Sequence, residues 1–246
     1  MAWRAGIDRL KDAPEPYFVW GSPLLALRAR PPIQRCIFMD MNKRNVEALE
    51  QRCRSFERTI LVRRGDVNKD LVPLVGAEIS RRAPCFCFLD PFGPELKWTT
   101  VKGLARLPRQ KRKVELMILF PLDMALLRLL PVSKQMPEED RNAVSQMFAT
   151  SEWWDIYQAR LKGEIEPWMA RASYLELYRR DLKGLGYEHV ISRPVVARRG
   201  PGMRSQNLYH LFFATDHPDG EKIMRQIFNK PLPLDGPVSQ QPPLFE

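Results

Sequence analysis

The stretch CFCFLDPFGPELKW, Cys85 to Trp98, decides how the rest of the chain is interpreted. It predicts a short buried strand that ends at an acid, a proline and an aromatic residue, followed by a polar entry into a helix. In open α/β sheets, ligands bind at the carboxyl ends of the strands. Asp90, Pro91 and Phe92 therefore stand where binding or catalysis is expected.

On both sides of this stretch, apolar strand patterns alternate with helical patterns. Asn42 and Asn68 are each expected to open a helix. Continuous apolar strands separated by helices predict an α/β fold with a mostly parallel sheet covered on both faces. The expected strands are Arg35–Asp40, Thr59–Asp66, Cys85–Asp90, Val114–Pro121, His189–Arg198 and Asn207–Asp216.

The pattern becomes helical between about Met124 and Gly186, which predicts a helical insertion. A glycine-, proline- and arginine-rich connection separates the last two strands, which predicts an antiparallel hairpin. A mostly parallel sheet that ends in such a hairpin resembles the Rossmann-like class I S-adenosylmethionine methyltransferase fold. We expect one domain of this kind over residues 1–230, followed by a proline-rich, disordered tail over residues 231–246.

The chain is basic, with 39 Lys and Arg against 29 Asp and Glu among 246 residues. A charge of +10 favours a nucleic-acid partner, although a solvated basic surface is an equally good interpretation. Four cysteines without a CxxC pair, and only three histidines, make a zinc site unexpected, so no metal is predicted. Cys85 and Cys87 are expected to share one sheet face as buried thiols. Because there is no membrane-spanning run and no signal-peptide core, we predict a cytoplasmic protein.

Three acids, Asp40, Asp66 and Asp90, end successive predicted strands. Carboxylates at such ends can accept hydrogen bonds from ribose hydroxyls and from the amine of adenine. Each acid taken singly is better explained as a strand terminator or helix cap. Together they indicate a shared nucleoside cleft, and a weaker alternative is a nuclease-like site in which they hold a divalent metal.

Asp90-Pro91-Phe92 resembles the motif of nucleobase amino-methyltransferases, although that motif usually has two prolines. The resemblance implies that the carboxylate and the proline carbonyl accept hydrogen bonds from an exocyclic amine, while the aromatic ring stacks on an extruded base. The equally weighted alternative is a strand-ending turn whose phenylalanine packs in the core.

Two further features could contribute to binding. Ser22 is a candidate N-cap of a helix that has Pro23 at its first position, and this helix could hold a cofactor carboxylate. The basic clusters 109–113 and 197–204 could form a phosphate-tracking groove with tryptophans as stacking platforms, although such residues are more often surface charge and core. The tryptophans in question are Trp153, Trp154 and Trp168.

Several stretches together resemble the three-Cys-motif partner (TcmP) family: GSPLLAL, RGDVN, FLDPFG, ILFP and ATDHPDG. The resemblance implies a class I methyltransferase-like domain, S-adenosylmethionine as cofactor, and a partner with a three-cysteine motif of iron–sulfur type. The N-terminus departs from the family, because Ala5-Gly6 is at most a remnant of the glycine-rich cofactor turn and the first strand is missing. A missing central strand would leave two unpaired sheet edges.

We therefore expect an S-adenosylmethionine-dependent methyltransferase acting on an amine of a nucleic-acid base. Asp90, Pro91 and Phe92 are the expected catalytic residues. The expected cofactor-binding residues are Gly6, Ser22, Asp40, Asp66 and Asn68. The alternative is a non-catalytic module that works with the three-cysteine protein.

Overall fold

The computed structural model describes residues 21–132, 135–197 and 206–230. Residues 21–65 belong to a smaller compact unit and Asp66–Asn229 form a larger one, and each is described by itself. Gly6, the expected tail over residues 231–246 and nearly all of the basic cluster 197–204 lie outside the described residues. The single domain expected over residues 1–230 stays a prediction. In the described part of the chain, no helix is long and apolar enough to span a bilayer.

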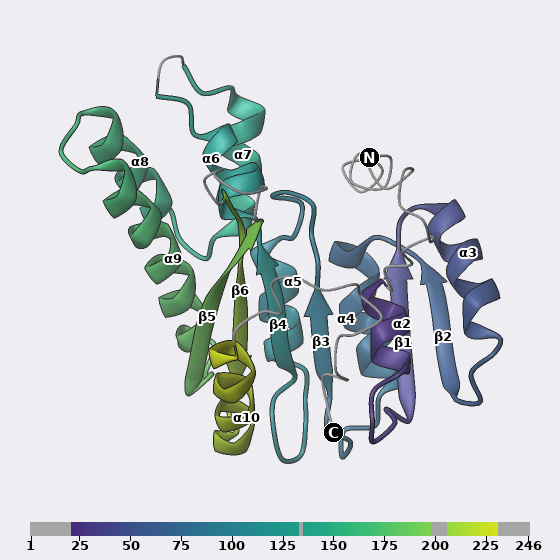
Figure 1. Ribbon diagram of the computed structural model, residues 1–246. Coiled ribbons are helices and arrows are strands. Elements are labelled where there is room, and N and C mark those ends of the chain that lie inside the picture. Colours follow the sequence, from purple (N-terminus) through teal and green to yellow (C-terminus); the bar gives the residue numbers. More distant parts are fainter. Residues whose placement is uncertain (1–20, 133–134, 198–205, 231–246) are drawn as a thin grey trace, which may run out of the picture. The chain divides into compact units, whose positions relative to one another are not determined.

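The smaller unit contains two parallel strands (Figure 1). Its elements are α2 (Ser22–Leu27), β1 (Arg35–Asp40), α3 (Lys43–Cys53) and β2 (Thr59–Arg64). The side chain of Asn42 accepts a hydrogen bond from the Arg44 amide and caps α3, as predicted. The core of the unit consists of Leu24, Leu27, Cys36, Val46, Cys53 and Val62.

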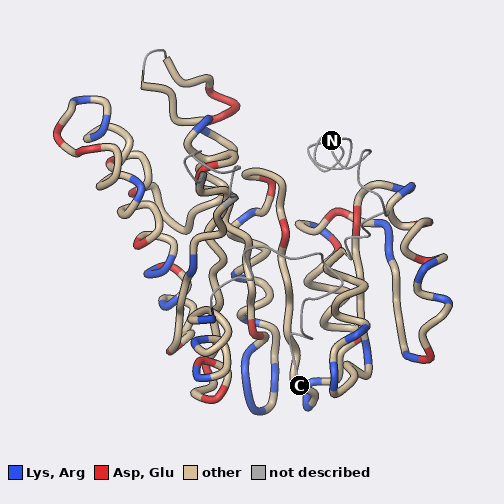
Figure 2. Tube along the Cα trace, in the orientation of Figure 1, with Lys and Arg blue, Asp and Glu red and all other residues tan. Residues whose placement is uncertain are grey.

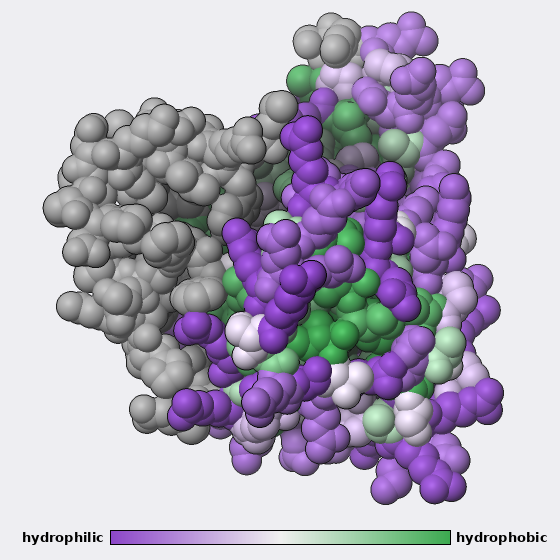
Figure 3. Space-filling view, turned by 90° about the vertical axis from the view of Figure 1, so that its right-hand side faces the viewer, coloured by the Kyte–Doolittle hydropathy of each residue, from purple (hydrophilic) through white to green (hydrophobic). Residues whose placement is uncertain are grey.

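This core is small, and some of the hydrophobic side chains around it are only partly buried. Leu49, Phe56 and Ile60 pack against the core without being enclosed by it. Figure 3 looks onto the side that carries α3 and β2 and shows hydrophobic residues exposed between hydrophilic ones. Over residues 21–65, the smaller unit therefore leaves part of its apolar surface exposed.

The larger unit is a four-stranded sheet flanked by helices, in the order β3-β4-β6-β5. Strands β3 and β4 are parallel, and β6 is antiparallel to both β4 and β5, which confirms the predicted C-terminal hairpin. The elements are α4 (Val67–Glu78), β3 (Phe86–Leu89), α5 (Trp98–Ala105), β4 (Glu115–Phe120), η2 (Leu122–Leu126), α6 (Leu127–Leu129), α7 (Glu138–Met147), α8 (Glu152–Leu161), α9 (Pro167–Gly184), β5 (His189–Ala197), β6 (Gln206–Thr215) and α10 (Pro218–Asn229).

The described strands form two sheets and not the single sheet that was expected. Within the described residues, β1 pairs only with β2, and β3 pairs only with β4. An α/β protein with parallel strand pairs and a C-terminal antiparallel hairpin is thus confirmed. Helices between β4 and β5, where the sequence pattern becomes helical, are also confirmed.

One face of the larger sheet carries an aromatic core. The ring of Phe120 on β4 lies 4.5 Å from that of Tyr178 on α9, and the ring of Phe212 on β6 lies 5.3 Å from Tyr178. Trp98, at the start of α5, meets Tyr178 edge-on at 5.7 Å. Aromatic pairs at these separations are favourable beyond the area they bury. The cluster anchors α5 and α9 to the same face.

The opposite face is only partly covered. Met224 of α10 packs on Ile191 and Phe213 of β5 and β6. On β3, the outermost strand, Phe86 and Phe88 are 51% and 38% exposed. The prediction that β3 is buried is wrong for this face, because α10 covers the face only at β5 and β6 and leaves these phenylalanines exposed.

Cys85 and Cys87 alternate with those phenylalanines and share the other face, as the strand period requires. Burial raises the pKa of both thiols, and it raises that of Cys87 to about 12. Burial also raises the pKa of Cys36 and Cys53 in the smaller unit. All four cysteines are free thiols.

We predict that Gly103→Ala destabilises the larger unit. A Cβ at Gly103 of α5 would lie 2.9 Å from a methyl carbon of Val72 on α4, and a β-branched side chain has little freedom to move away. Overpacking of this kind costs about 1–3 kcal/mol. Gly184→Ala is the matched control, since no atom lies within 4 Å of its added Cβ. Urea unfolding of both variants checks the prediction, and equal midpoints would contradict it.

Candidate functional site

Asp90 follows directly after β3, and its side chain is exposed to solvent. Neighbouring atoms nevertheless desolvate the carboxyl group enough to raise its pKa. Within the described residues, no hydrogen bond or ion pair engages this carboxylate. Asp90 is therefore a free acceptor at the carboxyl end of a parallel strand.

Phe92 is 80% exposed. Its backbone amide donates a hydrogen bond of 2.8 Å to Oε1 of Glu95, which fixes the turn while the ring points to solvent. The alternative in which Phe92 packs in the core is therefore wrong. Pro91 is half-buried, and its carbonyl accepts no hydrogen bond from the described residues. As far as the described residues show, the loop presents two acceptors without a hydrogen-bond donor beside one exposed aromatic ring.

Asn68 of α4 holds this loop in place. Its Nδ2 donates to the Glu95 carbonyl at 2.8 Å. Its Oδ1 accepts from the Lys97 amide at 2.9 Å and from the Thr100 hydroxyl at 2.8 Å. Two bonds use both lone pairs of that oxygen, so Asn68 keeps only one donor hydrogen for a cofactor. The expectation that Asn68 opens the helix is wrong, because the N-cap is Asp66.

Asp66 is the N-cap of α4, and Asp40 accepts hydrogen bonds from the start of the next helical segment. Oδ1 of Asp66 accepts from the Asn68 amide at 2.9 Å. Asp40 accepts from the Asn42 amide at 2.6 Å and from Nδ2 of Asn45 at 2.8 Å. Each carboxylate has about four acceptor positions and so keeps some for a ligand. Asp40 belongs to the smaller unit and Asp66 to the larger one, so convergence of the three acids stays a prediction.

Ser22 is the first residue of α2 and not its cap. The N-cap is Gly21, and no side chain caps the helix. With six residues, α2 is also too short to have a developed helix dipole. Ser22 therefore gains no support as a cofactor ligand, and Gly6 lies outside the described residues.

Tyr209 on β6 lies close enough to Asp90 for the charge of Asp90 to affect its pKa. Desolvation raises the pKa of Tyr209, and the nearby negative charge of Asp90 raises it further. The β-strand period places Tyr209 and His210 on opposite faces of β6. Sequence reasoning missed Tyr209 because the position of β6 beside β4 does not follow the order of the chain.

A second polar cluster lies on the His210 side of β6. His210 pairs with Phe120, the last residue of β4, and Asp123 follows in the π-helical turn η2. Arg171 of α9 donates a hydrogen bond to Oδ1 of Asp123. Oδ2 of Asp123 is buried and has no hydrogen-bond partner among the residues that the structure describes. The strand end ILFP, followed by an acid at Asp123, was the available sequence signal.

His210 makes stability depend on pH. Burial lowers its pKa, the charge of Asp123 opposes this shift, and the charges of Arg171 and Arg179 add to it. Between the lowered pKa and the ordinary value of about 6.5, the unfolded chain binds more protons than the folded one. The free energy of unfolding is therefore expected to fall as the pH drops through this window.

Urea unfolding at about pH 7.5 and about pH 5.5 checks this expectation, because the two values bracket the titration of histidine. His210→Gln should lose less stability than the native chain between these values. His189 and His217 are present in both proteins, so their contribution cancels. Equal losses in the two proteins would contradict the assignment.

The basic cluster 109–113 lies at the amino end of β4, whereas Asp90 is at the carboxyl end of the parallel strand β3 (Figure 2). Arg112 donates to the Asp216 carbonyl at 3.0 Å, and Lys113 to the Ala105 carbonyl at 3.3 Å. These cations hold loops together at the end of the sheet opposite to Asp90. The expected groove between clusters 109–113 and 197–204 stays a prediction, because residues 198–204 are outside the described part of the chain.

The three tryptophans have different environments. Trp153 is 1% exposed and belongs to the core, so its expected role as a stacking platform is wrong. Trp154 is covered by the guanidinium of Arg141, 4.2 Å from the ring centroid. Trp168 is 68% exposed at the start of α9.

No family model, no curated protein and no solved structure matches this chain. The resemblance to the TcmP family therefore rests on the quoted motifs alone. Across the described residues, no group of three or more histidine, cysteine or acidic side chains could hold a metal ion. Of the three strand-end acids, only Asp90 combines a free carboxylate with an exposed aromatic neighbour.

Proposed function

We propose that this protein is a class I methyltransferase-like enzyme of the TcmP type that methylates an amine of a nucleic-acid base. The observation that carries the proposal is the 80% exposure of Phe92, two residues after Asp90, whose carboxylate has no partner among the described residues. Burying an aromatic ring is favourable, so a ring held in solvent by a fixed turn indicates a surface that stacks on a ligand. The C-terminal antiparallel hairpin supports the same fold class.

The residues of the loop have distinct roles in this mechanism. Phe92 stacks on a base that has left its helix, and Asp90 with the Pro91 carbonyl accepts the two N–H bonds of the exocyclic amine. Both acceptors increase the electron density on the amine nitrogen. The raised pKa of Asp90 makes its carboxylate a stronger acceptor for the proton that the amine loses.

S-adenosylmethionine would supply the methyl group as an electrophile bound to sulfur. Asp66 keeps acceptor positions for hydroxyl or amine groups of this cofactor, and Asp40 does so in the smaller unit. Asn68 contributes by fixing the loop that carries Phe92.

Methyl transfer tests the proposal directly. The full chain is incubated with S-adenosylmethionine carrying a tritiated methyl group and with bulk RNA or DNA, and label in the nucleic acid is counted. We expect transfer by the native chain and a loss of roughly 100-fold or more in Asp90→Asn, the range found for a residue in general acid–base catalysis. The absence of label, together with no thermal shift from the cofactor, would overturn it.

A non-catalytic partner module is the second candidate. It is favoured by the unpaired edges of β1 and β3 among the described strands and by the saturated Oδ1 of Asn68. This candidate predicts co-purification with a three-cysteine-motif protein of iron–sulfur type and no cofactor binding. Transfer of labelled methyl groups would exclude it.

A further inference from the structure

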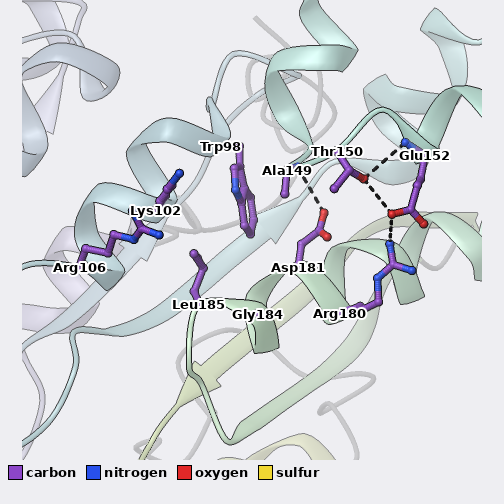
Figure 4. Close-up of a pocket in the computed structure, with 10 residues that line it drawn as sticks. All are labelled: Trp98, Lys102, Arg106, Ala149, Thr150, Glu152, Arg180, Asp181, Gly184 and Leu185. Atoms are coloured by element: carbon purple, nitrogen blue, oxygen red, sulfur yellow. Dashed lines mark hydrogen bonds and ion pairs between the residues drawn. The ribbon is translucent and has the colours of Figure 1, made fainter.

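A cleft of about 400 Å³ lies between α5 and the C-terminal part of α9 (Figure 4). Its size is within the range of small-molecule sites. It belongs entirely to the larger unit. The lining residues are Trp98, Lys102, Arg106, Ala149, Thr150, Glu152, Arg180, Asp181, Gly184 and Leu185.

One wall of the cleft is cationic. Trp98, Lys102 and Arg106 follow one another at intervals of four residues, so they lie on one face of α5 or just past its end. Neither Lys102 nor Arg106 makes an ion pair or a side-chain hydrogen bond with the described residues. Two uncompensated cations on one wall favour an anionic group.

The opposite wall carries a buried acid. Asp181 of α9 is 8% exposed, and its only described hydrogen bond is a long one of 3.3 Å from the Ala149 amide. The neighbouring cation, Arg180, is already engaged by Glu152 at 2.6 Å. Burial raises the pKa of Asp181, as expected for a carboxylate that lacks a close partner of its own.

The two walls do not neutralise each other. No ion pair or hydrogen bond joins Lys102 or Arg106 to Asp181 among the described residues, and the charges that shift the pKa of Asp181 are those of Arg180 and Glu152. In Figure 4 the Trp98 ring lies between the cations of α5 and the carboxylate of Asp181. The ring of Tyr178 packs edge-on against the Trp98 ring, with 5.7 Å between the ring centroids. The Trp98 ring is therefore held in place and presents an apolar surface between the opposite charges.

We propose that this cleft binds a small molecule with an acidic group at one end and a protonated amine at the other. The acidic group contacts Lys102 and Arg106, the amine contacts Asp181, and the apolar part of the molecule lies on Trp98. A ligand with these features supplies a partner for every unpaired charge of the cleft. The lining of this cleft does not include Asp90, Pro91 or Phe92, and the proposal does not depend on methyl transfer.

A series of linear probes tests the proposal on the full chain. The affinities of 4-aminobutanoate, 6-aminohexanoate and 8-aminooctanoate are measured by calorimetry and compared with hexanoate and hexylamine. We expect one of the amino acids to bind at least about tenfold more tightly than either single-charge probe, a difference of about 1.4 kcal/mol. If no amino acid binds more tightly than hexanoate and hexylamine, the proposal is overturned.

Substitutions test which residues bind the acidic group of the probe and which residue binds its amine. Asp181→Asn keeps the shape of the side chain and should abolish the advantage of the amino acid over hexanoate. Lys102→Gln with Arg106→Gln should weaken both acid-bearing probes about equally. This double variant changes side chains that are not buried and tests the cleft even if Asp181→Asn fails to fold. Lys222→Gln on α10, outside the cleft, is the control for loss of a surface cation and should change nothing.

Discussion

Replacing Phe92 by alanine is expected to weaken binding of single-stranded nucleic acid by roughly 5- to 150-fold without destabilising the protein. Stacking of one base on an aromatic ring contributes about 1–3 kcal/mol, which corresponds to that range. The ring is 80% exposed, so its removal opens no cavity. Surface substitutions of this kind change the free energy of unfolding by about 0.5 kcal/mol or less.

Fluorescence anisotropy with a labelled oligonucleotide measures the affinity, and urea unfolding measures the stability. Phe92→Trp should keep the affinity because the larger ring still stacks. Ile223→Ala, on α10, removes another exposed apolar side chain and should have no effect. If Phe92→Ala and Ile223→Ala bind alike, Phe92 is not a stacking surface and the proposed function loses its main support.

Arg171→Met is expected to cost about 3–5 kcal/mol of stability, the usual penalty for leaving a buried carboxylate without its cation. The side chain of Asp123 is only 11% exposed and that of Arg171 29% exposed. Oδ2 of Asp123 already lacks a partner, so the substitution would leave both oxygens unsatisfied. The affected turn η2 connects β4 to the helices that precede β5.

Adding Asp123→Leu to Arg171→Met should recover most of the loss, because an apolar pair of similar volume replaces a broken ion pair. Arg225→Met is the matched control, since the Arg225 side chain is 60% exposed and its pair with Glu221 contributes at most about 1 kcal/mol. Urea unfolding compares all three. A loss in Arg171→Met no greater than in Arg225→Met would show that the buried charge has another partner.

Local signals predicted the strands well. The boundaries of β1 agree with the pattern, and those of the other strands differ by at most two residues, because apolar runs and turn residues are local features. The cap at Asn42 was predictable for the same reason, whereas caps at Gly21 and Asp66 were each displaced from the expected residue. The order β3-β4-β6-β5 was not predictable, since it depends on contacts between distant segments.

In the candidate site too, local sequence predicted some features, and others depend on contacts between distant segments. Asp90 was found because it ends a strand, but the exposure of Phe92 depends on a turn that Glu95 and Asn68 hold in place. The bonds of Asn68 reach residues 27 and more positions away. The pair of Asp123 and Arg171 spans 48 positions, and no local pattern contains such information.

The raised thiol pKa values have a practical consequence for labelling. The thiolate is the species that reacts with maleimides, and burial keeps the native cysteines protonated at neutral pH. A new cysteine at an exposed position such as Lys222 would therefore take up a fluorophore much faster than the native thiols. Site-specific spectroscopy of this chain should be possible without first removing its own sulfur atoms.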